Sequence, residues 1–137
     1  MKRTFLVLAL LVATPAAAQT PPPVQLDYTQ FTLANGLRVI HHEDHSVPLV
    51  SVNMWYHVGS AREKTGRTGF AHLFEHLMFM GSGHVPPGEF DSWLEGAGGG
   101  NNGSTSNDRT NYWINVPSNS LELALFLESD RMGYLLD

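Results

Sequence analysis

Residues 49–58, LVSVNMWYHV, alternate with the two-residue period of a β-strand that is buried on one face only. A second run, TNYWINV at 110–116, repeats the alternation. In each run the apolar side chains share one face of the predicted strand: Val50, Val52, Met54 and Tyr56 in the first, and Tyr112, Ile114 and Val116 in the second. These two faces must be covered by another layer of structure.

The other predicted elements supply that layer. Asn35-Gly36, between the runs 28–33 and 37–42, predicts a β-hairpin. Helical patterns predict three helices, over residues 70–80, 86–96 and 118–137. We expect Ser118 to be the N-cap of the last helix. The order of strands and helices favours an α+β fold, an antiparallel-rich sheet with helices packed on one side.

The first residues have the three parts of a secretory signal peptide. Lys2 and Arg3 form a basic start, residues 4–12 are largely apolar, and Ala16–Ala18 supply small residues for cleavage. The predicted organisation is a signal peptide over 1–18, an extended linker over 19–27 and one incomplete domain over 28–137. We therefore expect an exported protein, either periplasmic or secreted.

Composition excludes several classes of function. The chain has no cysteine, which excludes disulfides and thiolate metal sites. Its formal net charge is −5, and nucleic-acid binding relies on an excess of Lys and Arg, so no nucleic-acid partner is expected. No run after the signal peptide is long enough to cross a bilayer, so no membrane partner is expected after cleavage.

The segment HLFEH, residues 72–76, has two histidines four positions apart and a glutamate directly before the second. At about 100° per residue, a helix over this segment has two sides, with Phe70, Leu73, Phe74 and Leu77 on one and His72, Glu75, His76 and Phe79 on the other. Because most of its circumference is apolar, we expect the helix to be buried. A buried glutamate beside two histidines is costly unless something such as a cation satisfies it.

The spacing of His72 and His76 suits a metal ion. Residues i and i+4 lie one turn apart, so both imidazoles can reach one ion at the ~2.0–2.1 Å typical of zinc–nitrogen bonds. Glu75 lies beside them and could accept a proton from water whose pKa the metal lowers toward ~7. The alternative is a polar patch without metal, because histidine pairs alone are common.

Two other groups could bind a metal ion. HHEDH at 41–45 is more simply a solvated loop, although adventitious metal binding there remains an alternative. Glu128 could act as a further ligand, but an ion pair with Arg131 three residues later is the simpler interpretation.

HLFEH also matches the inverted zinc motif H-x-x-E-H of the inverzincins. With TGFAHLFEHLMFMGS, VPPGEFDSWLE, TSNDRTNYW and NSLELALFLESDRM, it makes residues 31–137 resemble the N-terminal catalytic domain of the pitrilysin/insulinase (M16) zinc peptidases. The resemblance implies a pitrilysin-like half-domain, Zn²⁺ as cofactor, and a metalloendopeptidase that cleaves extended peptides.

The resemblance also implies roles for individual residues. His72 and His76 match the zinc-binding histidines, and Glu75 matches the catalytic glutamate. Asn102 and Gly103 match the start of an edge strand that pairs with the substrate peptide.

The family has parts that this sequence does not contain. Its third zinc ligand, a glutamate on a later helix, is expected beyond Asp137, as is a second M16-like domain or subunit. We therefore expect a fragment that needs further C-terminal sequence for activity. The alternative is a catalytically inactive truncated module that binds metal or serves in assembly.

Overall fold

The computed structural model describes residues 25–135. The predicted signal peptide and most of the predicted linker lie outside the described residues. The chain divides into two compact units, with the division between Glu43 and Asp44. In the first unit, β1 (Thr29–Thr32) and β2 (Arg38–His41) pair antiparallel, and Gly36 has a positive φ of 89° in the turn between them. The hairpin predicted from Asn35-Gly36 is confirmed.

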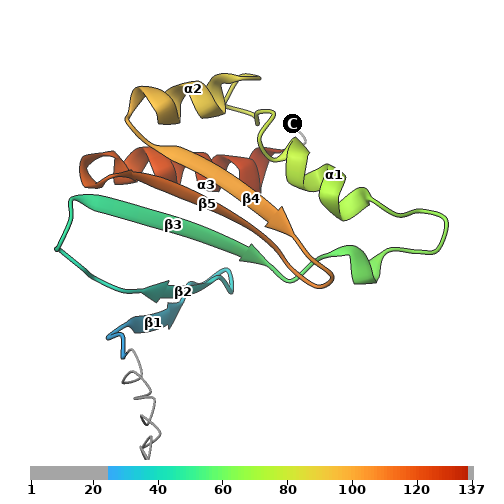
Figure 1. The fold of residues 1–137 in the computed structure, drawn as a ribbon, viewed down its shortest axis with the longest axis horizontal. Coiled ribbons are helices and arrows are strands. Elements are labelled where there is room, and N and C mark those ends of the chain that lie inside the picture. Colours follow the sequence, from blue (N-terminus) through green and yellow to red (C-terminus); the bar gives the residue numbers. More distant parts are fainter. Residues whose placement is uncertain (1–24, 136–137) are drawn as a thin grey trace, which may run out of the picture. The chain divides into compact units, whose positions relative to one another are not determined.

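The second unit is built on a three-stranded antiparallel sheet (Figure 1). Its central strand, β5 (Thr110–Pro117), lies between β3 (Leu49–Tyr56) and β4 (Gly100–Thr105). The register pairs Val52 with Ile114, so the apolar faces predicted for the two alternating runs coincide. β4 is an edge strand of this sheet, with its glycines in extended backbone.

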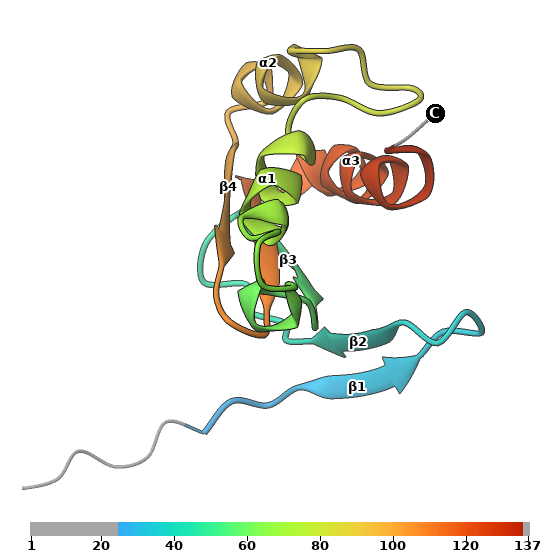
Figure 2. The same ribbon diagram turned by 90° about the vertical axis from the view of Figure 1, so that its right-hand side faces the viewer.

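Three helices pack on the apolar face of this sheet: α1 (Phe70–Leu77), α2 (Glu89–Gly96) and α3 (Leu121–Tyr134). Figures 1 and 2 show α2 and α1 near β4, and α3 lying along the sheet. The core joins α2, β5 and α3 and consists of Val85, Phe90, Leu94, Ile114, Val116, Ala124 and Leu127. Burying these side chains supplies most of the hydrophobic stabilisation, and the α+β fold with helices on one side of the sheet is confirmed.

The burial of α1 differs from the prediction. Its apolar side chains are 37–52% exposed: Phe70, Leu73, Phe74 and Leu77. Glu75 and Met78 are buried instead. The prediction that this helix is buried is therefore wrong within the described residues. Hydrophobicity alone does not orient this helix, because the sheet offers the Glu75 carboxylate a hydrogen-bond donor, the Thr105 hydroxyl.

Two sequence predictions concern α3: its N-cap and the partner of Glu128. Ser118 begins a short 3₁₀ turn, Ser118–Ser120, and Ser120 lies at the N-cap of α3. The prediction that Ser118 is the N-cap is therefore wrong, and no side chain of the described residues caps this helix. Glu128 forms an ion pair with Arg131, which confirms the simpler interpretation of that residue. Across residues 25–135, no helix has the length and apolar character needed to cross a membrane.

Candidate metal and catalytic site

The start of α1 is fixed by a carboxylate from the preceding loop. Gly69 has a φ of 94° and turns the chain into the helix. Glu63 accepts hydrogen bonds from the amides of Ala71 (2.8 Å) and Gly69 (2.7 Å). These bonds satisfy amides that a helix leaves unpaired at its N-terminus, and they lower the pKa of the Glu63 carboxyl below its ordinary value. Sequence reasoning missed Glu63, since no capping pattern places an acid so far before the helix.

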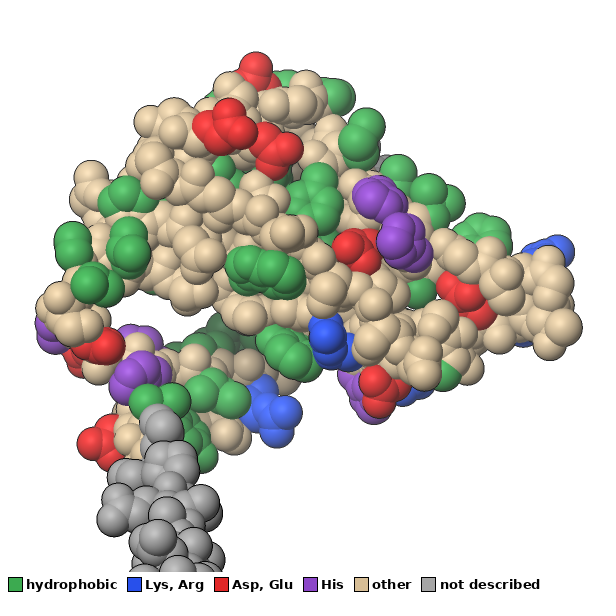
Figure 3. Space-filling model, in the orientation of Figure 1, with side chains coloured by type: hydrophobic (Ala, Val, Ile, Leu, Met, Phe, Trp, Pro, Cys, Tyr) green, Lys and Arg blue, Asp and Glu red, His purple; other side chains and the backbone are tan. Residues whose placement is uncertain are grey.

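His72 and His76 converge as the helical spacing predicts. Their Nε2 atoms lie 2.8 Å apart and their ring centroids 4.7 Å apart. Both side chains are exposed, and Figure 3 shows two histidine side chains together over α1 with an acidic side chain next to them. At this distance one ring donates a hydrogen bond to the other, so the two Nε2 atoms face each other.

The histidine pair fits a zinc ion as a partial ligand set. Two nitrogens on one tetrahedral zinc, each at ~2.0–2.1 Å, lie about 3.3 Å apart, so a small rotation of the rings suffices. In the part of the chain that the structure describes, no group of three His, Asp or Glu side chains could hold a metal ion. His72 and His76 could therefore supply at most two ligands, and neither HHEDH nor Glu128 joins them in a group of three within the described residues.

Glu75 lies beside the histidines but is directed toward the sheet. Its side chain is only 9% exposed, and its Oε2 accepts a hydrogen bond from the Thr105 hydroxyl at the end of β4. Thr105 was not singled out from the sequence, because the two residues are thirty positions apart and only the register of β4 brings them together. The Glu75 carboxylate thus lies next to the histidine pair, with one oxygen bound to Thr105.

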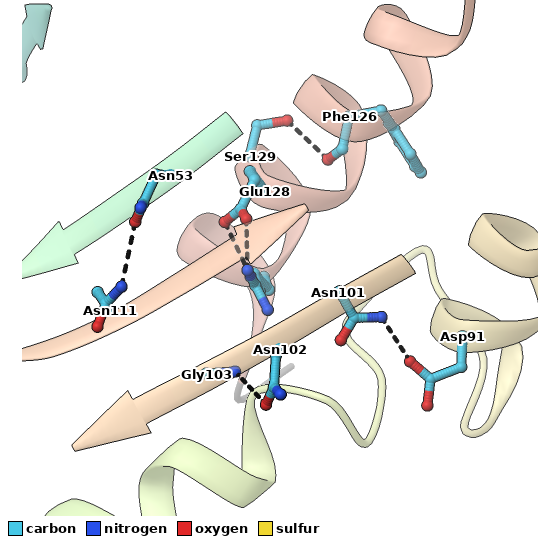
Figure 4. Close-up of polar contacts among 10 residues, drawn as sticks. Asn53, Asp91, Asn101, Asn102, Gly103, Asn111, Phe126, Glu128 and Ser129 are labelled. Atoms are coloured by element: carbon cyan, nitrogen blue, oxygen red, sulfur yellow. Dashed lines mark hydrogen bonds and ion pairs between the residues drawn. The ribbon is translucent and has the colours of Figure 1, made fainter. Parts of the chain in front are cut away.

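Asn102 and Gly103 lie on the edge strand, as their match to the family pattern implies. The Asn102 side chain accepts a hydrogen bond from the Gly103 amide at 2.8 Å, and Asn101 donates one to Asp91 on α2 at 2.8 Å (Figure 4). A Cβ at Gly103 would lie 3.1 Å from the ring of Phe79. The absence of a side chain at 103 thus lets β4 pass close under the end of α1.

A buried arginine, Arg131, packs against the aromatic rings near Gly103. The Arg131 guanidinium lies 4.5–5.6 Å from the ring centroids of Tyr112, Phe90 and Phe79. Its Nε donates to Glu128 at 2.9 Å, and Nη2 donates to the other carboxylate oxygen. Burial raises the pKa of Glu128 despite Arg131, and it raises the pKa of Tyr112 to about 12. Arg131 thus contacts the same two aromatic rings, Phe79 and Tyr112, that lie next to Gly103.

A second histidine–carboxylate pair anchors the loop after α1. The Nδ1 of His84 and the hydroxyl of Ser82 each lie 2.6 Å from an oxygen of Asp130. Burial alone would raise the pKa of Asp130, but the hydrogen bonds from Ser82 and His84 outweigh it and lower that pKa. The His84 ring also packs edge-on against the ring of Tyr134 on α3, with centroids 4.8 Å apart, so the group attaches the loop to α3.

Comparison with known proteins identifies the family. A family model described as insulinase (peptidase family M16) matches residues 38–132. The chain belongs to peptidase family M16. The zinc protease PqqE of Helicobacter pylori is 35% identical over 98% of this M16 chain, and human insulin-degrading enzyme is 31% identical over 76% of it.

Solved structures agree with this assignment. A protease from Helicobacter pylori superimposes with a TM-score of 0.77 at 36% identity, covering 80% of this chain and 27% of that protein. Pitrilysin superimposes with a TM-score of 0.75 at 27% identity, covering 84% and 12%. The M16 chain spans 31% of the length of the PqqE relative and 10% of insulin-degrading enzyme.

Proposed function

We propose that this chain carries the zinc-binding and general-base residues of a metalloendopeptidase. The observation that carries the proposal is the convergence of the His72 and His76 Nε2 atoms, 2.8 Å apart, beside a buried carboxylate. Membership of a family whose relatives are named zinc proteases supports it.

Each residue has a defined part in the reaction. His72 and His76 would hold zinc through Nε2, and the bound ion would supply Lewis-acid chemistry, which polarises a carbonyl and lowers the pKa of water. The free oxygen of Glu75 accepts a proton from the attacking water and returns it to the leaving amine. The peptide lies as an additional strand on the β4 edge near Asn102 and Gly103, bound by main-chain hydrogen bonds.

Activity of the whole protein requires more than these residues. A catalytic zinc site normally has three protein ligands and one open position. His72 and His76 would supply two, and no group of three potential ligands is present within residues 25–135. The exposed apolar side of α1, with Phe70, Leu73, Phe74 and Leu77, is a surface that further protein would cover. We propose that a third ligand and a second M16-like domain or subunit complete the enzyme.

A second candidate is a non-catalytic module that binds metal loosely or serves in assembly. The described residues bring only two potential metal ligands, His72 and His76, together at this site, which favours this non-catalytic candidate. Sequencing the gene downstream of codon 137 separates the candidates. An in-frame continuation with a glutamate that completes the zinc site supports the enzyme, whereas a stop codon supports the module.

The function is tested with Glu75→Gln in the full-length protein. This change removes the proton acceptor and keeps the shape of the side chain. We expect zinc content to equal that of the wild type and peptide hydrolysis to be lost. If Glu75→Gln still hydrolyses peptides, the assignment of Glu75 as the general base is wrong.

We also propose that the protein is exported, on the basis of the sequence of residues 1–18. The expected mature N-terminus is Gln19. N-terminal sequencing of protein from the exported fraction tests this, and an intact Met1 on the functional protein would contradict it.

A further inference from the structure

The hydroxyl of Thr105 is committed to the Glu75 carboxylate. A threonine hydroxyl has one hydrogen to donate, and an ionised carboxylate only accepts, so the direction of the bond is fixed. The neighbouring Thr110 hydroxyl donates to the carbonyl of Val58 at 3.0 Å and lies 3.4 Å from the Thr105 hydroxyl, so it does not compete for Glu75.

This bond leaves the two oxygens of Glu75 in different states. Oε2 accepts from Thr105, whereas Oε1 makes no hydrogen bond to any residue of the described part of the chain. The side chain is mostly buried, so losing the Thr105 hydroxyl would leave the carboxylate without its protein donor and free to reorient.

The same bond separates Glu75 from the metal-binding nitrogens. His72 and His76 face each other, yet within residues 25–135 Glu75 does not join them in a group that could hold an ion. A carboxylate without a competing donor readily binds a divalent metal ion.

We propose that Thr105 is a positioning residue that holds Glu75 as a proton acceptor and keeps it out of the zinc ligand set. The inference rests on the proposed function and deepens it. Thr105 ends β4, the strand proposed to bind the peptide, so one strand sets the position of both substrate and base.

The packing of β4 explains how a strand residue reaches the helix. Gly103, two residues earlier on the same face, would place a Cβ 3.1 Å from Phe79 and 3.2 Å from Tyr112. Because Gly103 has no Cβ, the strand lies close to α1. Thr105 is then within hydrogen-bonding distance of Glu75.

The test compares Thr105→Val, which keeps the shape and removes the hydroxyl, with Thr105→Ser, which keeps the hydroxyl. In the full-length protein we expect Thr105→Val to lower kcat about 10- to 100-fold. We expect KM to change less than about twofold, since the strand edge is retained. Thr105→Ser should restore kcat. The matched control is Thr110→Val, which loses a hydrogen bond to backbone but none to Glu75, and should keep a kcat near that of the wild type.

A second readout does not depend on hydrolysis. In cobalt-substituted protein, Thr105→Val should change the visible absorption spectrum because Glu75 becomes a metal ligand. The double variant Thr105→Val/Glu75→Gln should return to the spectrum of Glu75→Gln alone.

If the wild type binds metal but does not cleave peptides, the proposed function fails and the spectra still test Thr105. If Thr105→Val does not fold, Thr105→Ala is judged by the same readouts. Unchanged kcat and an unchanged cobalt spectrum in the folded variant would overturn the inference.

Discussion

The buried pair of Arg131 and Glu128 gives a sharp prediction about stability. Arg131 is 1% exposed and Glu128 is 2% exposed, and the guanidinium donates two hydrogen bonds to the carboxylate. Arg131→Met keeps the length of the side chain and removes every donor. The buried carboxylate then has no partner, which typically costs ~3–5 kcal/mol of the free energy of unfolding. This is a large part of the ~5–15 kcal/mol that stabilises a typical domain.

The double variant Arg131→Met/Glu128→Leu separates the cost of an unpaired charge from the cost of lost packing. Replacing a buried ion pair by apolar residues of similar volume is often neutral or stabilising. Some loss is expected here because Arg131 also lies over three aromatic rings, each contact worth up to about 2 kcal/mol when desolvated. We therefore expect the double variant to be more stable than Arg131→Met.

Urea unfolding of the full-length protein, followed by tryptophan fluorescence, measures these differences. The Arg131→Met deficit should also depend on pH. Burial raises the folded-state pKa of Glu128, so the deficit is smallest below the ordinary Glu value of ~4.3 and grows as pH rises through the folded-state pKa. An Arg131→Met protein as stable as the wild type, or a double variant no better than the single one, would refute the reasoning.

Three further predictions concern α1, β4 and the core. Glu63→Gln should destabilise α1 at neutral pH and matter less as pH falls through the lowered folded-state pKa of Glu63, as measured by amide hydrogen exchange in α1. Gly103→Val should cost ~1–3 kcal/mol because its side chain meets Phe79, whereas Gly100→Val, where no atom lies within 4 Å, should be nearly neutral in urea unfolding. Leu94→Ala, fully buried, should cost ~2–5 kcal/mol in the same assay, and Leu125→Ala, half exposed, should cost much less.

Local periodicity predicted most of the second unit. The alternation through Val52 and Ile114 identified two strands and their inward faces, and the register pairs these two residues directly. The spacing of His72 and His76 predicted that their rings converge, and they do. These features follow from the period of a strand or a helix, which one segment alone contains.

Contacts between distant segments were not predictable in the same way. The orientation of α1 depends on a hydroxyl at position 105 that receives the Glu75 carboxylate, and no pattern around the helix indicates it. The cap from Glu63 and the hydrogen bonds of Asp130 to Ser82 and His84 likewise join residues through the fold. Hydrophobicity alone predicted the wrong buried side for α1, because a polar group whose hydrogen bonds are satisfied can be buried in place of an apolar one.

Zinc stoichiometry of the purified full-length protein tests the paired-histidine site most directly. We expect about one zinc per chain in the wild type and in a His41→Ala/His42→Ala control, with loss of zinc in His72→Ala and in His76→Ala. Unchanged zinc in His76→Ala, or loss of zinc in the control instead, would contradict the assignment of the metal to α1.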